Sequence, residues 1–168
     1  CGASTTSVHE VYRRVLEDLL PLAERKHLDI GVEIEQDARV CINEIDLTAV
    51  VKNLVDNAIR YTPAHGRVDL TLKMDNGQAL LQIRDSGPGI VVEEQERVFD
   101  PFYRSLGTDE SGSGLGLSIA QRIVERLGGR FALVNRPGLG ACFEITLPCE
   151  VQRLEIDATS GDGDGTSS

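Results

Sequence analysis

Two segments that alternate apolar and polar residues flank a tight turn near the middle of the chain. The turn is Asp75-Asn76-Gly77, and its Asn-Gly pair is a strong short-range hairpin signal. The alternating apolar residues are Val68, Leu70, Leu72, Ala79, Leu81 and Ile83. A period of two places them on one face of each strand, so the segment predicts an antiparallel hairpin that ends at Asp85 and must be covered on that face.

Two stretches with helical spacing can provide this cover. The first follows Ser7, which has Glu10 in capping-box position, and we expect Pro21 to kink or end the helix. The second carries apolar residues at i, i+3, i+4 and i+7 from Leu47 to Ala58. Asp46 is its expected N-cap and Pro63 its stop.

The remaining periodic segments complete the secondary structure. Alternation over 28–34 and again over 40–42 predicts two neighbouring strands that form a hairpin. A third helix over 115–127 is closed by Gly128-Gly129. A last hairpin joins 131–134 to 142–147. We therefore predict a two-layer α/β (α+β) sandwich, with three helices on one face of a mixed, mostly antiparallel sheet of about five strands.

Composition narrows the class of protein. The chain has 168 residues, of which 40% are hydrophobic, and a net charge of −10, which disfavours binding to nucleic acid. It has no apolar run long enough for a membrane span. The four scattered cysteines show no metal-ligand spacing; we expect reduced thiols, with Cys41 and Cys142 as small hydrophobic strand residues.

These patterns give a domain organisation. Residues 1–7 are expected to be a flexible N-terminus, 8–148 one folded domain, and 149–168 a disordered acidic tail. Periodicity disappears between Ser86 and Ser113, and an aperiodic stretch of this length inside a compact domain is usually functional. We expect a mobile lid over about 91–113.

One flank of the second helix is polar. At 100° per residue, Asn53, Asn57 and Arg60 lie together beside the apolar stripe. Amide oxygens one turn apart can hold a hard cation that keeps most of its waters, and an arginine one turn later can bind a phosphate. An ordinary solvated helix face has the same spacing, so the pattern alone leaves both readings open.

Two glycine-rich segments complete the candidate site. In the segment 85–90, Asp85 ends a strand, and Gly87 and Gly89 follow, where a backbone without side chains allows close approach of a flat ligand. The carboxylate could accept a hydrogen bond from an exocyclic amine; the alternative is a simple turn. The segment 112–118 opens the third helix, whose free N–H groups could bind a polyphosphate.

Together these segments resemble the ATP-binding catalytic domain of bacterial two-component sensor histidine kinases, within the ATPase superfamily that also contains gyrase. Residues 53–61 resemble the N box, 85–90 the first glycine box, 99–104 the F box and 112–117 the second glycine box. Residues 138–143 resemble the closing G-T-x-F strand motif, with Ala141 where threonine is usual. The resemblance covers about residues 8–148 and implies a Bergerat-type ATP-binding fold.

The resemblance also implies roles for residues. Asn57, with Asn53, would hold Mg²⁺, Arg60 and Tyr61 would contact the phosphates and the nucleotide rim, and Asp85 would bind the adenine amine. Arg104 would stabilise the transferring γ-phosphoryl group, so Asn53, Arg60 and Arg104 form the expected catalytic set. The other expected ATP-binding residues are Gly87, Gly89, Ile90, Gly112, Gly114, Leu115, Gly116 and Leu117.

The implied phosphoacceptor is a histidine on an upstream dimerisation helix, and no such helix pair fits before Asn53, so we do not expect His9 to be the acceptor. The implied partners are those upstream helices and a response regulator. We expect a cytoplasmic domain of an inner-membrane sensor protein. Two alternatives stay open at this point: a serine kinase of the anti-sigma type, and a nucleotide-binding interaction module without transfer activity.

Overall fold

The computed structural model of the chain describes residues 5–87, 116–136 and 140–149. In chain order its elements are β1 (Thr6–Ser7), α1 (Val8–Arg25), β2 (Asp29–Ile34), β3 (Arg39–Val40), α2 (Glu44–Tyr61), β4 (Arg67–Asp75), β5 (Gln78–Asp85), α4 (Gly116–Arg126), β6 (Arg130–Arg136) and β7 (Gly140–Pro148). The expected lid at 91–113 and the tail from 150 onward lie outside the described residues.

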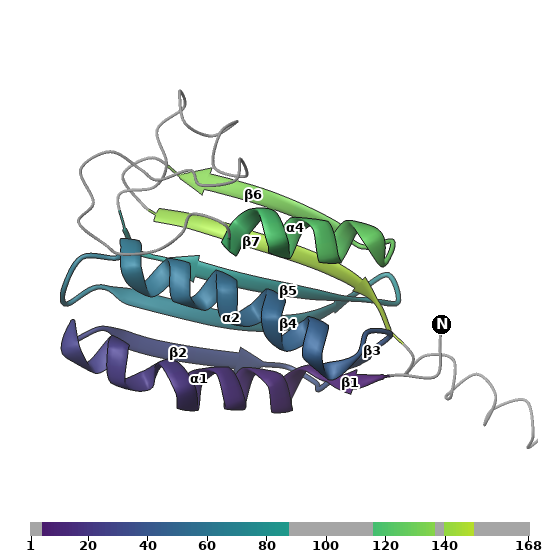
Figure 1. The fold of residues 1–168 in the computed structure, drawn as a ribbon, viewed down its shortest axis with the longest axis horizontal. Helices are drawn as coiled ribbons and strands as arrows, with labels where there is room; N and C mark the ends of the chain where they lie inside the picture. The colour runs from purple at the N-terminus through teal and green to yellow at the C-terminus, as the bar shows by residue number, and fades with distance from the viewer. Residues whose placement is uncertain (1–4, 88–115, 137–139, 150–168) are drawn as a thin grey trace, which may run out of the picture.

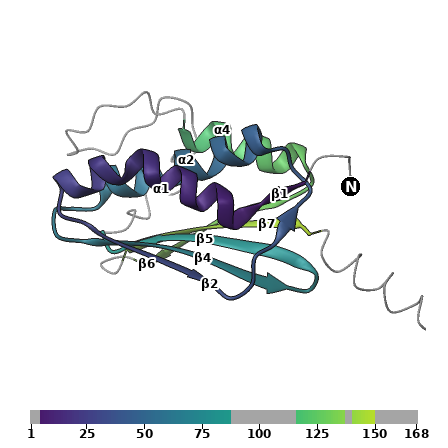
Figure 2. The same ribbon diagram turned by 90° about the horizontal axis from the view of Figure 1, so that it is seen from below.

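The described elements form two layers. Five strands make one sheet in the order β2-β4-β5-β7-β6, in which β2 and β4 are parallel and the other pairs are antiparallel. Helices α1, α2 and α4 lie side by side on one face of this sheet (Figures 1 and 2). Side chains from both layers meet in one buried core. The predicted α/β sandwich is therefore confirmed.

The β4–β5 hairpin follows the predicted register. Asp75 pairs with Gln78 across a two-residue turn, and Asn76 and Gly77 have φ angles of 51° and 78°. Positive φ at both central residues is the geometry that Asn-Gly favours. The alternating apolar residues of both strands are buried under the helices.

Helix α1 begins as predicted and ends later. The Ser7 hydroxyl accepts a hydrogen bond from the Glu10 N–H at 3.3 Å, so the N-cap is confirmed. The sequence predicts that Pro21 kinks or ends the helix. Pro21 does not end the helix, which continues to Arg25. Pro21 removes one N–H donor on the exposed side, while Leu19 and Ala23 on the other side stay buried in the core.

The N-cap of α2 is Asn43 and not Asp46. The Asn43 side-chain oxygen accepts from the Asp46 N–H at 2.8 Å, and its amide nitrogen donates to the Asp46 carboxylate at 2.9 Å. Asp46 therefore sits three residues inside the helix, where its negative charge favours the helix N-terminus. The predicted end before Pro63 is confirmed, with Thr62 as the C-cap.

The predicted hairpin between 28–34 and 40–42 is wrong. β2 pairs in parallel with β4, and β3 pairs with β1. The intervening Asp37 binds the start of α1 instead of closing a hairpin: it accepts from the His9 N–H at 2.9 Å and from the Ser7 hydroxyl at 2.6 Å. Alternation indicates which face of a strand is buried, but it does not identify the neighbouring strand.

The ends of the folded region extend beyond the expected boundaries. Thr6 and Ser7, expected within the flexible N-terminus, form β1, and Cys149 forms a β-bridge with Val40. Cys142 is a buried free thiol within β7, as a small hydrophobic residue should be. Cys41 differs from the prediction, because it lies outside the strands and is disulfide-bonded.

Candidate functional site

The polar flank of α2 is positioned by its buried stripe. Seven apolar residues from Leu47 to Ile59 are buried against the sheet and the neighbouring helices. Asn53, Asn57, Arg60 and Tyr61 are half-buried at the margin of this stripe. The helical periodicity thus places the two amide side chains one turn apart at the edge of the core, as the sequence predicts.

Arg60 is held along the helix by an acidic neighbour. Its Nε lies 3.1 Å from both carboxylate oxygens of Asp56, one turn earlier. Both side chains are partly exposed, so the pair adds little to the stability of the fold. The pair instead orients the Arg60 side chain, because the contact through Nε restricts where the rest of the guanidinium group can point.

A lysine from another element satisfies the C-terminal end of α2. The Lys26 Nζ donates to the backbone oxygens of Ile59 and Arg60 at 2.9 and 2.8 Å. The Thr62 hydroxyl, which is fully buried, donates to the Ala58 oxygen at 2.6 Å. The Ala58 oxygen also accepts from the Thr62 N–H at 3.0 Å, whereas the Ile59 and Arg60 carbonyls belong to the last turn, where a helix offers no further N–H donor and a cation complements the helix dipole. Together the contacts hold the last turn of α2, which ends at Tyr61.

The Asp85 carboxylate lies at the end of β5 and is held by two backbone donors. The Gly87 N–H reaches its Oδ1 at 2.9 Å and the Ala141 N–H reaches the same oxygen at 3.3 Å. Burial raises the pKa of this carboxyl, and the two N–H donors oppose that shift. Oδ2 has no hydrogen-bond partner among the described residues, so it is the oxygen that can accept from a ligand.

Two glycines allow three elements to meet at this carboxylate. A Cβ on Gly87 would lie 3.0 Å from Asp85 Oδ1 and 3.3 Å from the backbone oxygen of Tyr61. Gly140 has a φ of 111°, and a Cβ there would overlap the Asp85 backbone oxygen. Only glycine tolerates this combination of close approach and positive φ. The start of β7 can therefore reach Asp85 only because residue 140 has no side chain.

Gly140 and Lys26 are two residues of this region to which no sequence pattern assigned a role. Gly140 lies within the closing strand motif at 138–143, which was a usable signal. Lys26 follows α1 in a segment without any motif, and only the tertiary structure brings it to α2. The departure from the family pattern at Ala141 leaves one contact intact, since the residue binds Asp85 through its backbone N–H.

The structure brings part of the predicted site together. Gly87 lies between the Asp85 carboxylate and the backbone of Tyr61, and Asn53, Asn57 and Arg60 lie on the preceding turns of α2. Gly116 begins α4, and Leu117 is buried in the core. The predicted residues that lie outside the described part are Gly89, Ile90, Arg104, Gly112, Gly114 and Leu115. The described part has no cluster of three or more His, Cys, Asp or Glu side chains that could hold a metal ion.

Known proteins are similar to this chain in sequence and in fold. Residues 42–151 match the family of histidine kinase-, DNA gyrase B- and HSP90-like ATPases. The chain is 40% identical over 148 residues to the sensor protein kinase PmrB of Pseudomonas aeruginosa. This alignment covers 85% of this chain and 30% of PmrB. It is 36% identical over 146 residues to the sensor histidine kinase RppB of Synechocystis, covering 84% of this chain and 32% of RppB. The chain thus spans about a third of the length of these relatives.

Solved structures agree. The mycobacterial sensor histidine kinase MprB superposes with a TM-score of 0.76 at 32% identity, over 87% of this chain and 97% of that one. The catalytic domain of the histidine kinase ThkA gives a TM-score of 0.76 at 30% identity, covering 86% and 95%. The chain therefore belongs to the family of histidine kinase-, DNA gyrase B- and HSP90-like ATPases. Within it, the chain is an ATP-binding catalytic domain of the sensor histidine kinase type.

Proposed function

We propose that the site formed by α2, the end of β5 and the start of β7 binds ATP, with Asp85 accepting a hydrogen bond from the adenine amine. The observation that carries this proposal is the half-buried Asp85 carboxylate and its two backbone donors. Backbone N–H groups hold Oδ1, and Oδ2 has no partner among the described residues. A Cβ on Gly87 would lie 3.0 Å from Oδ1 of the same carboxylate, so a residue without a side chain leaves this space open for a flat base.

Mg²⁺ is part of the same proposal, and the described side chains fit it. Asn53 and Asn57 offer neutral amide oxygens, which suit a hard cation that keeps several waters and binds mainly through phosphates. When bound, the ion would neutralise part of the charge on the polyphosphate. Arg60 follows on the same helix, where Asp56 holds its Nε, and its guanidinium group would contact a phosphate.

We infer that the reaction is transfer of the γ-phosphoryl group to a histidine on a separate segment of the parent protein. Phosphoryl transfer requires positioning and charge stabilisation more than covalent chemistry. Arg60 and Arg104 are the proposed cationic groups, and the glycines at 112, 114 and 116 are proposed to approach the phosphates.

The relatives are sensor kinases, so we further propose that a response regulator then receives the phosphoryl group. The proposed setting is a domain facing the cytoplasm in an inner-membrane sensor. Within the described ranges, no helix has the length and apolarity needed to cross a membrane.

The test is a transfer assay with labelled ATP, Mg²⁺ and the upstream helices of the parent protein added as a separate polypeptide. We expect acid-labile, base-stable label on those helices and none on this chain, with Asp85→Asn reducing transfer at ATP concentrations below saturation and His9→Gln leaving it unchanged. Label on His9 of the chain alone would overturn the separate-acceptor proposal. Acid-stable label on serine would favour an anti-sigma type kinase, and ATP binding without transfer would favour an interaction module.

A further inference from the structure

β2 is an edge strand with a free hydrogen-bonding side. It is first in the sheet order β2-β4-β5-β7-β6, and among the described residues its only strand partner is β4. The N–H groups of Asp29 and Glu35 donate toward β4, to Gly66 and Leu72. In a parallel pair, alternate residues direct their backbone groups to opposite sides. The odd-numbered residues of β2 therefore face β4. The N–H and C=O groups of the alternate residues, Ile30, Val32 and Ile34, point to the free edge.

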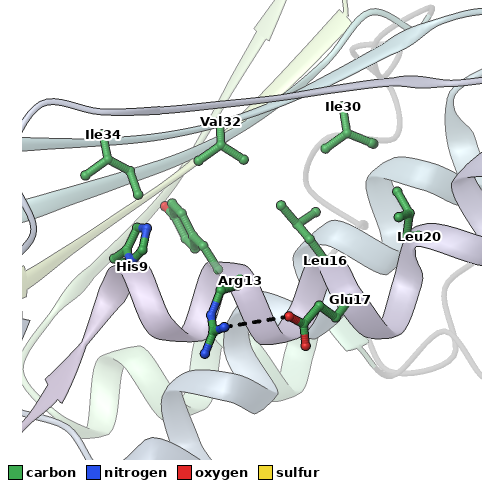
Figure 3. A pocket seen from close by; sticks show the side chains of 9 residues that line it. His9, Arg13, Leu16, Glu17, Leu20, Ile30, Val32 and Ile34 are labelled. Carbon is green, nitrogen blue, oxygen red and sulfur yellow. Dashed lines mark ion pairs between the residues drawn. The ribbon is translucent and has the colours of Figure 1, made fainter.

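The same three residues line an apolar groove beside α1. The groove has a volume of about 430 Å³. Its apolar lining consists of Tyr12, Leu16, Leu20, Ile30, Val32 and Ile34. Figure 3 shows Leu16 and Leu20 projecting from α1 toward β2. Leu20 is 44% exposed and Val32 is 47% exposed, so apolar surface remains uncovered by the described residues.

Acidic side chains lie on both the helix and the strand that border the groove. On α1, Arg13 lies 2.9 Å from Glu10 and 3.9 Å from Glu17, the second pair being drawn in Figure 3, so one arginine offsets only one of the two glutamates. On the opposite face of the sheet, β2 presents the exposed side chains of Asp29 and Glu33. Neither forms an ion pair with a described residue. Arg67 on β4 binds Asp69 at 2.9 Å, and its charge also acts on Asp29, so Glu33 is the less compensated of the two carboxylates.

We propose that β2 is the docking edge for an extended segment of a partner polypeptide in which apolar and basic residues alternate. Such a segment would add a strand to the sheet through the free backbone groups of Ile30, Val32 and Ile34. Its apolar side chains would fill the groove under α1, and its basic side chains would lie beside Asp29 and Glu33 on the other face.

Charge disfavours two other occupants. A second copy of this chain paired through β2 would bring Asp29 and Glu33 of each copy into the same row, in a chain of net charge −10. The C-terminal sequence 154–157 is Leu-Glu-Ile-Asp, so placing Leu154 and Ile156 in the groove would set Glu155 and Asp157 beside the β2 carboxylates. A segment of alternating apolar and basic residues can both fill the apolar groove and place positive charges beside the β2 carboxylates.

The experiment uses the full chain and a fluorescent octapeptide in which isoleucine and lysine alternate, with binding followed by anisotropy at low salt. The matched probes are a peptide with glutamate in place of lysine and a scrambled peptide of the same composition. We expect the alternating lysine peptide to bind roughly tenfold more tightly than either. In amide hydrogen exchange, binding should protect Ile30, Val32 and Ile34.

Variants locate the site. Val32→Lys should weaken binding of the lysine peptide roughly tenfold, because it places a charge in the apolar groove. Glu33→Lys should reverse the preference in favour of the glutamate peptide. Val134→Lys is the control, since Val134 is exposed on β6 at the opposite edge of the sheet and should leave binding unchanged.

Several results would overturn the proposal. Equal binding of the scrambled peptide, or binding without protection of the three amides, would mean that the lysines contact the acidic chain non-specifically. Self-association that Val32→Lys abolishes would identify a second copy as the occupant. Binding that occurs only after removal of residues 150–168 would identify the chain's own C-terminal segment.

Discussion

The Asp85 carboxyl binds its proton more tightly in the folded chain than in the unfolded chain, because burial raises its pKa more than the Gly87 and Ala141 donors lower it. The free energy of unfolding should therefore fall as the pH rises from the unfolded pKa, about 3.9, through the raised folded pKa. Asp85→Asn removes this titration. In urea denaturation across this pH range, the free energy of unfolding should decrease less for the variant than for the wild type. At neutral pH the variant should be at least as stable as the wild type.

The same substitution should impair ligand binding. An ionised carboxylate accepts a hydrogen bond from an amine more strongly than a protonated one, so affinity for adenosine should fall as the pH drops through the raised pKa of Asp85. Asp85→Asn should weaken adenosine binding by roughly 1–3 kcal/mol, because it leaves a polar group unpaired. Titration calorimetry with adenosine avoids protonation of the phosphates. Unchanged affinity in the variant would remove Asp85 from the site.

Gly140 is the second residue whose identity the site requires. Gly140→Ala would force a Cβ into the Asp85 backbone oxygen at a φ of 111°. We expect a loss of about 3 kcal/mol or more in the free energy of unfolding, measured by urea denaturation. Gly128→Ala is the matched control: its φ is 79°, but no atom lies within 4 Å of the added Cβ. This control should cost only about 1 kcal/mol, and an equal loss in the two variants would contradict the close contact at Asp85.

At the scale of an element, the start of α2 depends on a reciprocal pair of hydrogen bonds between Asn43 and Asp46. Asn43→Ala removes both and should lower the free energy of unfolding by about 1 kcal/mol. Ile45→Ala, in the same turn, is a suitable control because Ile45 is 81% exposed and should change stability by less than about 0.5 kcal/mol. A smaller loss in the free energy of unfolding for Asn43→Ala than for the control would mean that Asn43 is not the N-cap that stabilises α2.

The elements differ in how far the sequence determines them. The β4–β5 hairpin was predictable because its turn residues and both alternating runs are local and consistent. The partner of β2 was not, since the parallel pairing joins residues separated by helix α2. Pro21 shows a related limit: burial of Leu19 and Ala23 maintains a helix that local propensity would end.

At the scale of the whole molecule, the site could be predicted only in part. The N box on α2 and the Asp85 segment carry local signals, and the end of β5 brings Gly87 beside the backbone of Tyr61. Gly140 and Lys26 belong to segments far from α2 and β5 in the sequence. The start of β7 contacts Asp85, and Lys26, just after α1, binds the C-terminal end of α2. Such contacts depend on the packing of complete elements, which no local pattern encodes.

The central claim is that the described residues form a nucleotide site that requires Asp85 and the α2 amides. The most direct measurement is calorimetric titration of the full chain with ATP, with and without Mg²⁺, beside Asp85→Asn and Asn57→Ala. The account predicts Mg²⁺-enhanced binding by the wild type, weaker binding at every Mg²⁺ concentration for Asp85→Asn, and loss of the Mg²⁺ enhancement for Asn57→Ala. Wild-type affinity in both variants, or no binding by the wild type at millimolar ATP, would contradict it.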